Sequence, residues 1–148
     1  MKNLVIVESP TKAKTIGKIL GRKYSVVSTM GHVIDLPRSR LGVEIDNDFA
    51  PQYIIMTARK KVVSQLKKDA KDCEHVYIAT DPDREGEAIG WHLKERLFPD
   101  KSVHRVVFHE ITSEAIKHAF EQPREFDRNM VEAQAGRRIL DRIVGYHL

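Results

Sequence analysis

The sequence predicts an α/β fold with a mostly parallel sheet and helices on both of its faces. Short apolar runs rich in β-branched residues alternate along the chain with longer segments whose apolar residues recur at helical spacing. Strands that alternate with helices favour parallel pairing and a sheet covered on both sides. The chain has 148 residues, which is enough for one domain with a substantial core.

The first strand and helix have clear boundaries. Residues 4–7 form an apolar run that predicts a buried strand. Ser9 can cap the next helix, Pro10 suits its first turn, and Gly21 supplies its end. The pattern then predicts a strand at 24–29, a loop interrupted by Gly and Pro at 31–50, and a third strand at 53–56.

The rest of the chain continues the alternation. An amphipathic helix at 57–71 places Val62, Val63 and Leu66 inward and many lysines outward. The remaining expected elements are a strand at 75–80, a helix at 85–97, a strand at 103–108, a helix at 112–120 and a longer helix at 127–146. Pro123 and its polar neighbours mark a junction, so we expect one domain over 1–122 and the start of another over 123–148.

A cluster of carboxylates follows the strand at 75–80. Asp81, Asp83, Glu85 and Glu87 lie within seven residues, and like charges this close raise one another's pKa. Carboxylate oxygens suit Mg²⁺, which takes one or two carboxylates and keeps several waters. The alternative is an acidic loop that caps the next helix, with Asp81 or Asp83 as N-cap and Glu85 in the first turn.

Glu8 directly follows the first strand. Functional loops of open parallel sheets gather at the carboxyl ends of strands, so Glu8 faces the acidic cluster if the two strands are neighbours. Such convergence favours the metal interpretation. Lys12 adds a charge for phosphate near a helix N-terminus, although a single lysine is more often a solvated side chain. The glycines of a Walker-type loop are missing, which disfavours kinase-like nucleotide binding.

Two further features suit a polyanion. Arg138 and Arg142 lie one turn apart on the last helix and suit contact with a phosphate backbone; the alternative is an Arg–Asp surface pair. His32 sits in a loop, where it could contact phosphate, but a lone loop histidine is more often structural. The net charge of +4 permits a nucleic-acid partner without requiring one.

The composition also indicates the cellular compartment of the protein. The single cysteine, Cys73, excludes an intramolecular disulfide and fits a reducing environment. The sequence has no apolar run long enough to span a membrane and no signal-peptide cleavage site, so we expect a cytoplasmic protein without membrane contact.

Glu8 together with the DxDxE pattern resembles the TOPRIM domain of topoisomerases, primases and some nucleases. Five sequence segments occur in the same order as in the N-terminal part of bacterial-type DNA topoisomerases I, which are type IA enzymes, and resemble them. The segments are VIVESPTKAKTI, MGHVIDLP, ATDPDREGEAIGWH, VVFHEIT and GRRILDRIVGY. The resemblance implies a Rossmann-like TOPRIM domain over 1–122. It also implies that 123–148 holds the first helix of an adjoining domain that lines a groove for single-stranded DNA.

The resemblance assigns roles to the candidate residues. It implies that Glu8 is a general acid/base beside the scissile phosphate, and that Lys12 positions and neutralises that phosphate. It implies an Mg²⁺ site, needed chiefly for strand rejoining, formed by Glu8, Asp81, Asp83 and Glu85. The DNA contacts that it implies come from Lys12, His32, Arg137, Arg138 and Arg142.

The tyrosines depart from the family pattern. Type IA cleavage uses a tyrosine followed by an arginine in a later domain, and none of Tyr24, Tyr53, Tyr77 and Tyr146 has that setting. We therefore expect a fragment of an enzyme that passes and rejoins one DNA strand to relax negative supercoils, with the rest of the parent chain as partner. Alone, the fragment should be inactive. The alternatives are a self-sufficient TOPRIM nuclease or primase-like module, a DNA-binding module without chemistry, and a reverse gyrase module.

Overall fold

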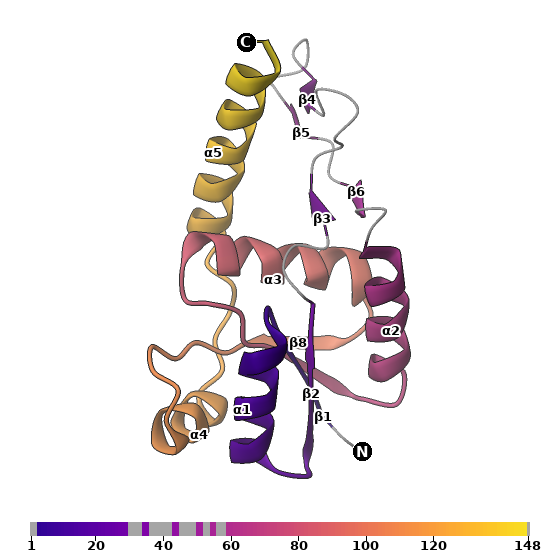
Figure 1. The fold of residues 1–148 in the computed structure, drawn as a ribbon, viewed down its shortest axis with the longest axis vertical. Coiled ribbons are helices and arrows are strands. Elements are labelled where there is room, and N and C mark those ends of the chain that lie inside the picture. The colour runs from indigo at the N-terminus through magenta and orange to yellow at the C-terminus, as the bar shows by residue number, and fades with distance from the viewer. Residues whose placement is uncertain are drawn as a thin grey trace.

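The computed structural model describes residues 3–29, 34–35, 43–44, 50–51, 54–55 and 59–147. Its main sheet has four parallel strands in the order β2-β1-β7-β8 (Figure 1). The strands are β1 (Asn3–Val7), β2 (Tyr24–Ser28), β7 (His75–Ile78) and β8 (Ser102–Arg105). The predicted α/β class with a parallel sheet is confirmed, and β1 and β7 are neighbours as the functional prediction requires.

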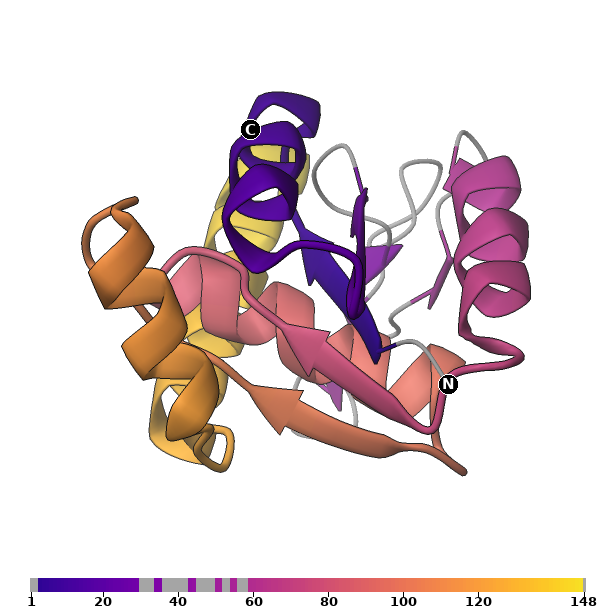
Figure 2. The ribbon, with the colours of Figure 1, turned by 90° about the horizontal axis from the view of Figure 1, so that it is seen from below.

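Helices cover both faces of the sheet. The helices α2 (Lys60–Ala70) and α3 (Arg84–Leu97) share a buried cluster with one face, and α1 (Pro10–Leu20) and α4 (Ser113–Glu121) share a second cluster with the other. Figure 2 shows α1 and α2 on opposite sides of β1. The central strand β1 therefore contributes to both cores: Leu4 and Ile6 to the first, Val5 and Val7 to the second. Burial on both faces explains why this strand is a continuous apolar run.

Local capping chemistry fixes the helix boundaries. The Ser9 hydroxyl accepts a hydrogen bond from the Lys12 N–H at 3.2 Å, and the Thr112 hydroxyl accepts one from the Ala115 N–H at 3.2 Å. Gly21 follows α1 with a φ of 80°, which favours glycine. The helix starts predicted at these hydroxyl residues are therefore confirmed within a residue.

The segment predicted as a loop at 31–50 contains short strands. These are β3 (Ile34–Asp35), β4 (Val43–Glu44) and β5 (Ala50–Pro51), while β6 (Ile54–Ile55) falls within the strand predicted at 53–56. They form two antiparallel pairs, β3 with β6 and β4 with β5, outside the main sheet. Pairs of two residues depend on long-range partners, so local turn signals did not reveal them.

The long helix α5 (Arg128–His147) packs on α3 and extends away from the sheet (Figure 1). The segment before it returns to the sheet edge, where Arg105 and Arg124 exchange backbone hydrogen bonds of 3.2 and 2.8 Å. The division at residue 122 stays a prediction. Within the described residues, none of the helices combines the length and hydropathy needed to cross a bilayer.

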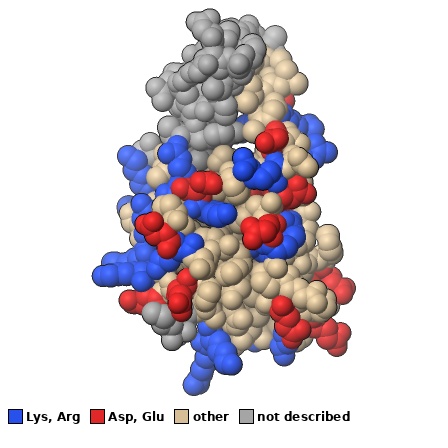
Figure 3. Space-filling view, turned by 180° about the vertical axis from the view of Figure 1, so that it is seen from behind, with Lys and Arg blue, Asp and Glu red and all other residues tan. Residues whose placement is uncertain are grey.

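Charges are mixed on one face of the molecule. Lys and Arg side chains are interspersed with Asp and Glu side chains over the face in Figure 3, without a large region of one sign.

Candidate active site at the carboxyl ends of β1 and β7

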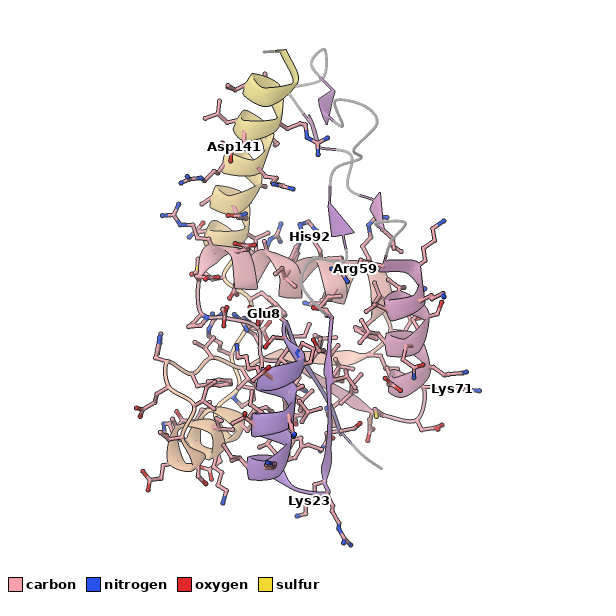
Figure 4. The ribbon with its side chains drawn as sticks, viewed as in Figure 1. Glu8, Lys23, Arg59, Lys71, His92 and Asp141 are labelled. Carbon is pink, nitrogen blue, oxygen red and sulfur yellow. The ribbon has the colours of Figure 1, made fainter. Side chains whose placement is uncertain are left out.

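The parallel pairing of β1 and β7 brings two distant parts of the sequence together. Ile6 pairs with Ile78, and the Ala79 N–H extends the ladder by donating to the Ile6 carbonyl at 2.9 Å. Glu8 and Asp81 follow these two strands, so both lie at the same edge of the sheet. Figure 4 shows Glu8 at this edge, close to α3.

Glu8, Lys12 and Asp81 form a compact cluster. The Lys12 Nζ lies 2.7 Å from Asp81 Oδ1 and 3.4 Å from Glu8 Oε1. The backbone N–H of Asp81 donates to Glu8 Oε1 at 2.9 Å. The Lys12 and Glu8 side chains are 13% and 17% exposed, whereas that of Asp81 is 55% exposed. The cluster therefore has a sheltered interior and one carboxylate that opens to solvent.

The two carboxyl groups differ in acidity. Burial and the hydrogen bond with Asp81 raise the pKa of Glu8, although the charge of Lys12 opposes the shift. Hydrogen bonds from Glu8 and Lys12 lower the pKa of Asp81. Two adjacent carboxyl groups with different pKa values can take different roles: one transfers a proton and the other stabilises charge. Glu8 is thus suited to hold a proton, and Asp81 to remain ionised.

The acidic turn continues from Asp81 into α3. Asp83 is the N-cap: its Oδ1 accepts a hydrogen bond from the Gly86 N–H at 2.7 Å. Glu85 lies in the first turn of α3. Both side chains line a cavity of about 450 Å³ whose other walls include Arg84 and four residues of α5, namely Gln134, Arg137, Arg138 and Asp141. Arg142 follows one turn beyond Arg138 on α5.

The structure thus places the four predicted metal ligands in two groups. Glu8 and Asp81 surround Lys12, whereas Asp83 and Glu85 face the cavity beside α5. In the described part of the chain, no three His, Cys, Asp or Glu side chains converge closely enough to hold an ion. Mg²⁺ commonly uses one or two carboxylates and completes its shell with water and phosphate. The donor set fits a site of that kind and does not fit a cage made by protein alone.

A buried arginine binds the backbone of the acidic turn. Arg105 is 0% exposed. Its guanidinium donates to the carbonyls of Thr80 and Asp81, each at 2.8 Å, and to those of Ile78 and Val106, each at 3.1 Å. Arg105 therefore binds the backbone at the exact point where β7 gives way to the acidic turn.

Glu87 is the counter-ion of this arginine. It is also 0% exposed and accepts from Arg105 Nε at 2.8 Å, from Arg124 at 2.9 and 3.0 Å, and from the Asp127 N–H at 2.7 Å. Burial alone would raise the Glu87 pKa, but the hydrogen bonds from Arg124, Arg105 and Asp127 outweigh it and lower the pKa. This network connects the acidic turn to the start of α5.

The sequence analysis missed the role of this network. It grouped Glu87 with the other carboxylates of the turn and assigned nothing to Arg105 or Arg124. One signal was present: Arg105 precedes the apolar run Val106–Phe108, and a charged side chain next to a buried run requires a partner. His32, another predicted site residue, lies outside the described residues.

The fold and the site together define a class of protein. Residues 3–111 match the family described as the Toprim domain, and the chain belongs to that family. The predicted TOPRIM fold is therefore confirmed.

The comparison with solved structures identifies a more specific relative. Full-length topoisomerase I from Thermotoga maritima is 50% identical to this chain, with a TM-score of 0.87, and the match covers 97% of this chain. This chain spans 24% of that protein. A small TOPRIM domain protein from Bacillus stearothermophilus is 16% identical, with a TM-score of 0.49, and the match covers 84% of this chain and 90% of that one. The expected homology to topoisomerase I is confirmed.

Proposed function

We propose that this chain is the TOPRIM part of a type IA DNA topoisomerase that relaxes negative supercoils by passing and rejoining a single strand. The observation that carries the proposal is the cluster of Glu8, Lys12 and Asp81 at the ends of β1 and β7. The homology to topoisomerase I supports the same conclusion. The protein would act in the cytoplasm.

Glu8 is the proton-transfer group in this proposal. Its raised pKa allows it to give a proton to the departing 3′ oxygen of DNA and to take it back when the strand is rejoined. Lys12 would neutralise charge on the scissile phosphate. Its Nζ already contacts both carboxylates, so Lys12 lies within reach of a phosphate bound at this edge of the sheet.

The carboxylates would also hold Mg²⁺. Asp81, with Glu8 beside it, and Asp83 and Glu85 in the neighbouring group would supply hard oxygen ligands, with water and phosphate completing the shell. A bound ion would neutralise phosphate charge during rejoining. Lys12 and the ion would compete for Asp81, so Lys12 would release that carboxylate and turn toward phosphate when the ion binds.

The middle of α5 would contact single-stranded DNA. Arg137 and Arg138 line the cavity beside the acidic turn, and Arg142 extends the basic edge by one turn. Lys12 and His32 complete the proposed phosphate contacts. We assign residues 1–122 to the TOPRIM domain and 123–148 to the first helix of the adjoining DNA-groove domain. The nucleophilic tyrosine would come from the rest of the parent chain.

Salt-dependent binding of a fluorescent single-stranded oligonucleotide tests the DNA contact. Replacing Arg138 and Arg142 by alanine should weaken binding and reduce the slope of log K against log salt by about 1.4, because each single-strand phosphate contact contributes roughly 0.7. The matched control replaces Lys60 and Lys61 of α2, which removes the same charge elsewhere. Equal losses in the two variants would contradict the assignment to α5.

Incubation with DNA distinguishes the proposed topoisomerase fragment from the alternative of a self-sufficient nuclease. The 148-residue chain with Mg²⁺ or Mn²⁺ should neither relax supercoiled plasmid nor degrade single-stranded DNA. Degradation that disappears in Glu8→Gln would favour the nuclease, because hydrolysis by metal-activated water needs no tyrosine. Relaxation by the pure chain would show that one of its own tyrosines is the nucleophile.

A further inference from the structure

Two histidines lie side by side on the main sheet, away from the acidic cluster. His75 is the first residue of β7, and His104 lies on the edge strand β8. The Nδ1 of His75 is 3.1 Å from the Nε2 of His104, and the ring centroids are 5.2 Å apart with an interplanar angle of 38°. The proposed DNA chemistry uses neither residue.

The strand register explains this pairing. His104 pairs with Tyr77, and His75 lies two residues before Tyr77, so the three side chains point to the same face. The ring of His104 stacks on that of Tyr77 with centroids 5.0 Å apart and an angle of 27°. Tyr77 in turn packs against Tyr24 and Phe120. The histidine rings are therefore held by packing and are not two mobile surface groups.

The environment of His104 favours its neutral imidazole form. Burial lowers the pKa of His104, and the neighbouring His75 lowers it further, while the charge of Glu125 opposes the shift. A neutral imidazole has an unprotonated ring nitrogen, which is the form that binds metal ions.

We propose that His75 and His104 form a two-imidazole site for a divalent transition-metal ion such as Zn²⁺ or Ni²⁺, with water completing the coordination shell. Ring nitrogens bind Zn²⁺ at about 2.0–2.1 Å, so two ligands that subtend 90–110° lie about 2.9–3.4 Å apart. The observed 3.1 Å falls within this range. Imidazole suits Zn²⁺, Ni²⁺ and Cu²⁺ rather than Mg²⁺, so the site would differ in selectivity from the acidic cluster.

Binding requires a change of tautomer and a rotation of the two rings, because the ion must lie off the line that joins the hydrogen-bonded nitrogens. Without an ion, one of the two facing nitrogens carries the proton of the hydrogen bond and the other accepts it. When an ion binds, that proton moves to the outer nitrogen of the same ring, and both facing nitrogens become ligands. This exchange of tautomers releases no proton from the two rings. The ion would link β7 to the edge strand β8 and would stabilise the folded state by an amount that grows with the logarithm of its concentration above Kd.

The test uses the untagged, ¹⁵N-labelled chain in a large excess of Mg²⁺, which occupies oxygen sites. Zn²⁺ should shift the ring nitrogen signals of His75 and His104 together and to the same saturation point. His104→Gln and His75→Gln should each weaken Zn²⁺ binding by about tenfold or more in calorimetry, because each removes one of the two protein ligands. His118→Gln, which changes an exposed histidine on α4, is the matched control and should bind like the parent chain.

Two results would overturn the proposal. One is a titration of the parent chain in which the His75 and His104 rings do not shift, or shift no more than that of His118. The other is an equal Zn²⁺ affinity in the His104 and His118 variants. The ring signals are read in the unaltered protein, so they decide the question even if a variant fails to fold.

Discussion

At the scale of single residues, the acidic cluster depends on a lysine held between two unlike carboxyl groups. Lys12 contacts Asp81 at 2.7 Å and Glu8 at 3.4 Å, and so offsets the repulsion between them. The sheltered Glu8 has a raised pKa and the exposed Asp81 a lowered one. The two groups therefore contribute to stability with opposite dependence on pH.

Neutral replacements should reveal these opposite contributions. Above its ordinary pKa of 4.5, Glu8 binds more protons in the folded state than in the unfolded state, so its ionisation lowers stability as pH rises. Asp81 behaves in the reverse sense around its ordinary pKa of 3.8. Relative to the parent chain, Glu8→Gln should gain stability with rising pH and Asp81→Asn should lose it. Thermal unfolding between acidic and neutral pH measures both slopes; slopes of the same sign would contradict the assignment.

Gly86 allows the acidic turn to approach α3 closely. A Cβ at this position would collide with the Asp81 carbonyl oxygen and approach the Asp81 carbon and nitrogen to 2.8 Å. Because these atoms are backbone, the turn would have to move. Gly86→Ala should therefore destabilise the protein by about 2–3 kcal/mol in urea unfolding.

The matched control is Gly136→Ala on α5, where an added Cβ meets nothing within 4 Å. This change should stabilise the helix by about 0.5–1 kcal/mol, because alanine is the better helix former. Similar stabilities for the two variants would show that the turn yields at little cost.

At the scale of elements, the start of α3 serves two purposes. The Asp83 side chain caps the helix through the Gly86 N–H and also lines the cavity beside α5. The metal and capping interpretations of the acidic turn are therefore compatible at this residue.

Two substitutions of Asp83 separate the purposes. Asparagine caps as well as aspartate, so Asp83→Asn should lose little stability, whereas Asp83→Ala should lose about 1 kcal/mol. Both should weaken Mg²⁺ binding, because both remove a charged ligand. Urea unfolding and an Mg²⁺ titration followed by amide shifts near Asp81 give the two readouts. Equal stability of the Asp83→Asn and Asp83→Ala variants would contradict the capping role of Asp83. Unchanged Mg²⁺ binding in both variants would contradict its role as a metal ligand.

At the scale of the whole molecule, one buried network joins the sheet, the acidic turn and α5. Arg105 holds the carbonyls of Thr80 and Asp81, and Glu87 connects it to Arg124 and Asp127. Where the chain leaves the sheet for α5, the rings of Trp91 and Phe126 pack with their centroids 5.8 Å apart. The Cζ of Arg128 lies 4.6 Å from the centroid of the Trp91 ring. The basic helix is thus tied to the proposed catalytic edge by both charge and packing.

Removing the charge of Glu87 should loosen this connection. Glu87→Gln leaves the fully buried Arg105 without its counter-ion, and breaking such a pair costs about 3–5 kcal/mol. The control, Glu85→Gln, changes an exposed residue two positions earlier and should stay within about 0.5 kcal/mol of the parent chain. Urea unfolding followed by fluorescence of the single tryptophan, Trp91, measures both. A loss of under 1 kcal/mol in Glu87→Gln would mean that the network is not a major support.

Local patterns predicted much of the fold. Apolar runs located the four main strands, and Ser9, Gly21 and Thr112 located helix ends, because strand burial and capping depend on neighbouring residues. The two-residue strands between 34 and 55 and the partners of Arg105 depend on residues far away in the sequence, so the same reasoning did not find them.

The sequence by itself determined the α/β class, the order of the main elements, and the fact that carboxylates follow two separate strands. Only the tertiary structure decided which of those carboxylates meet. The pairing of β1 with β7 brings Asp81 to Glu8, while the start of α3 directs Asp83 and Glu85 toward α5. Spacing along the chain determines which strand each carboxylate follows. Its partners and its pKa depend on packing between distant elements, which local sequence patterns do not specify.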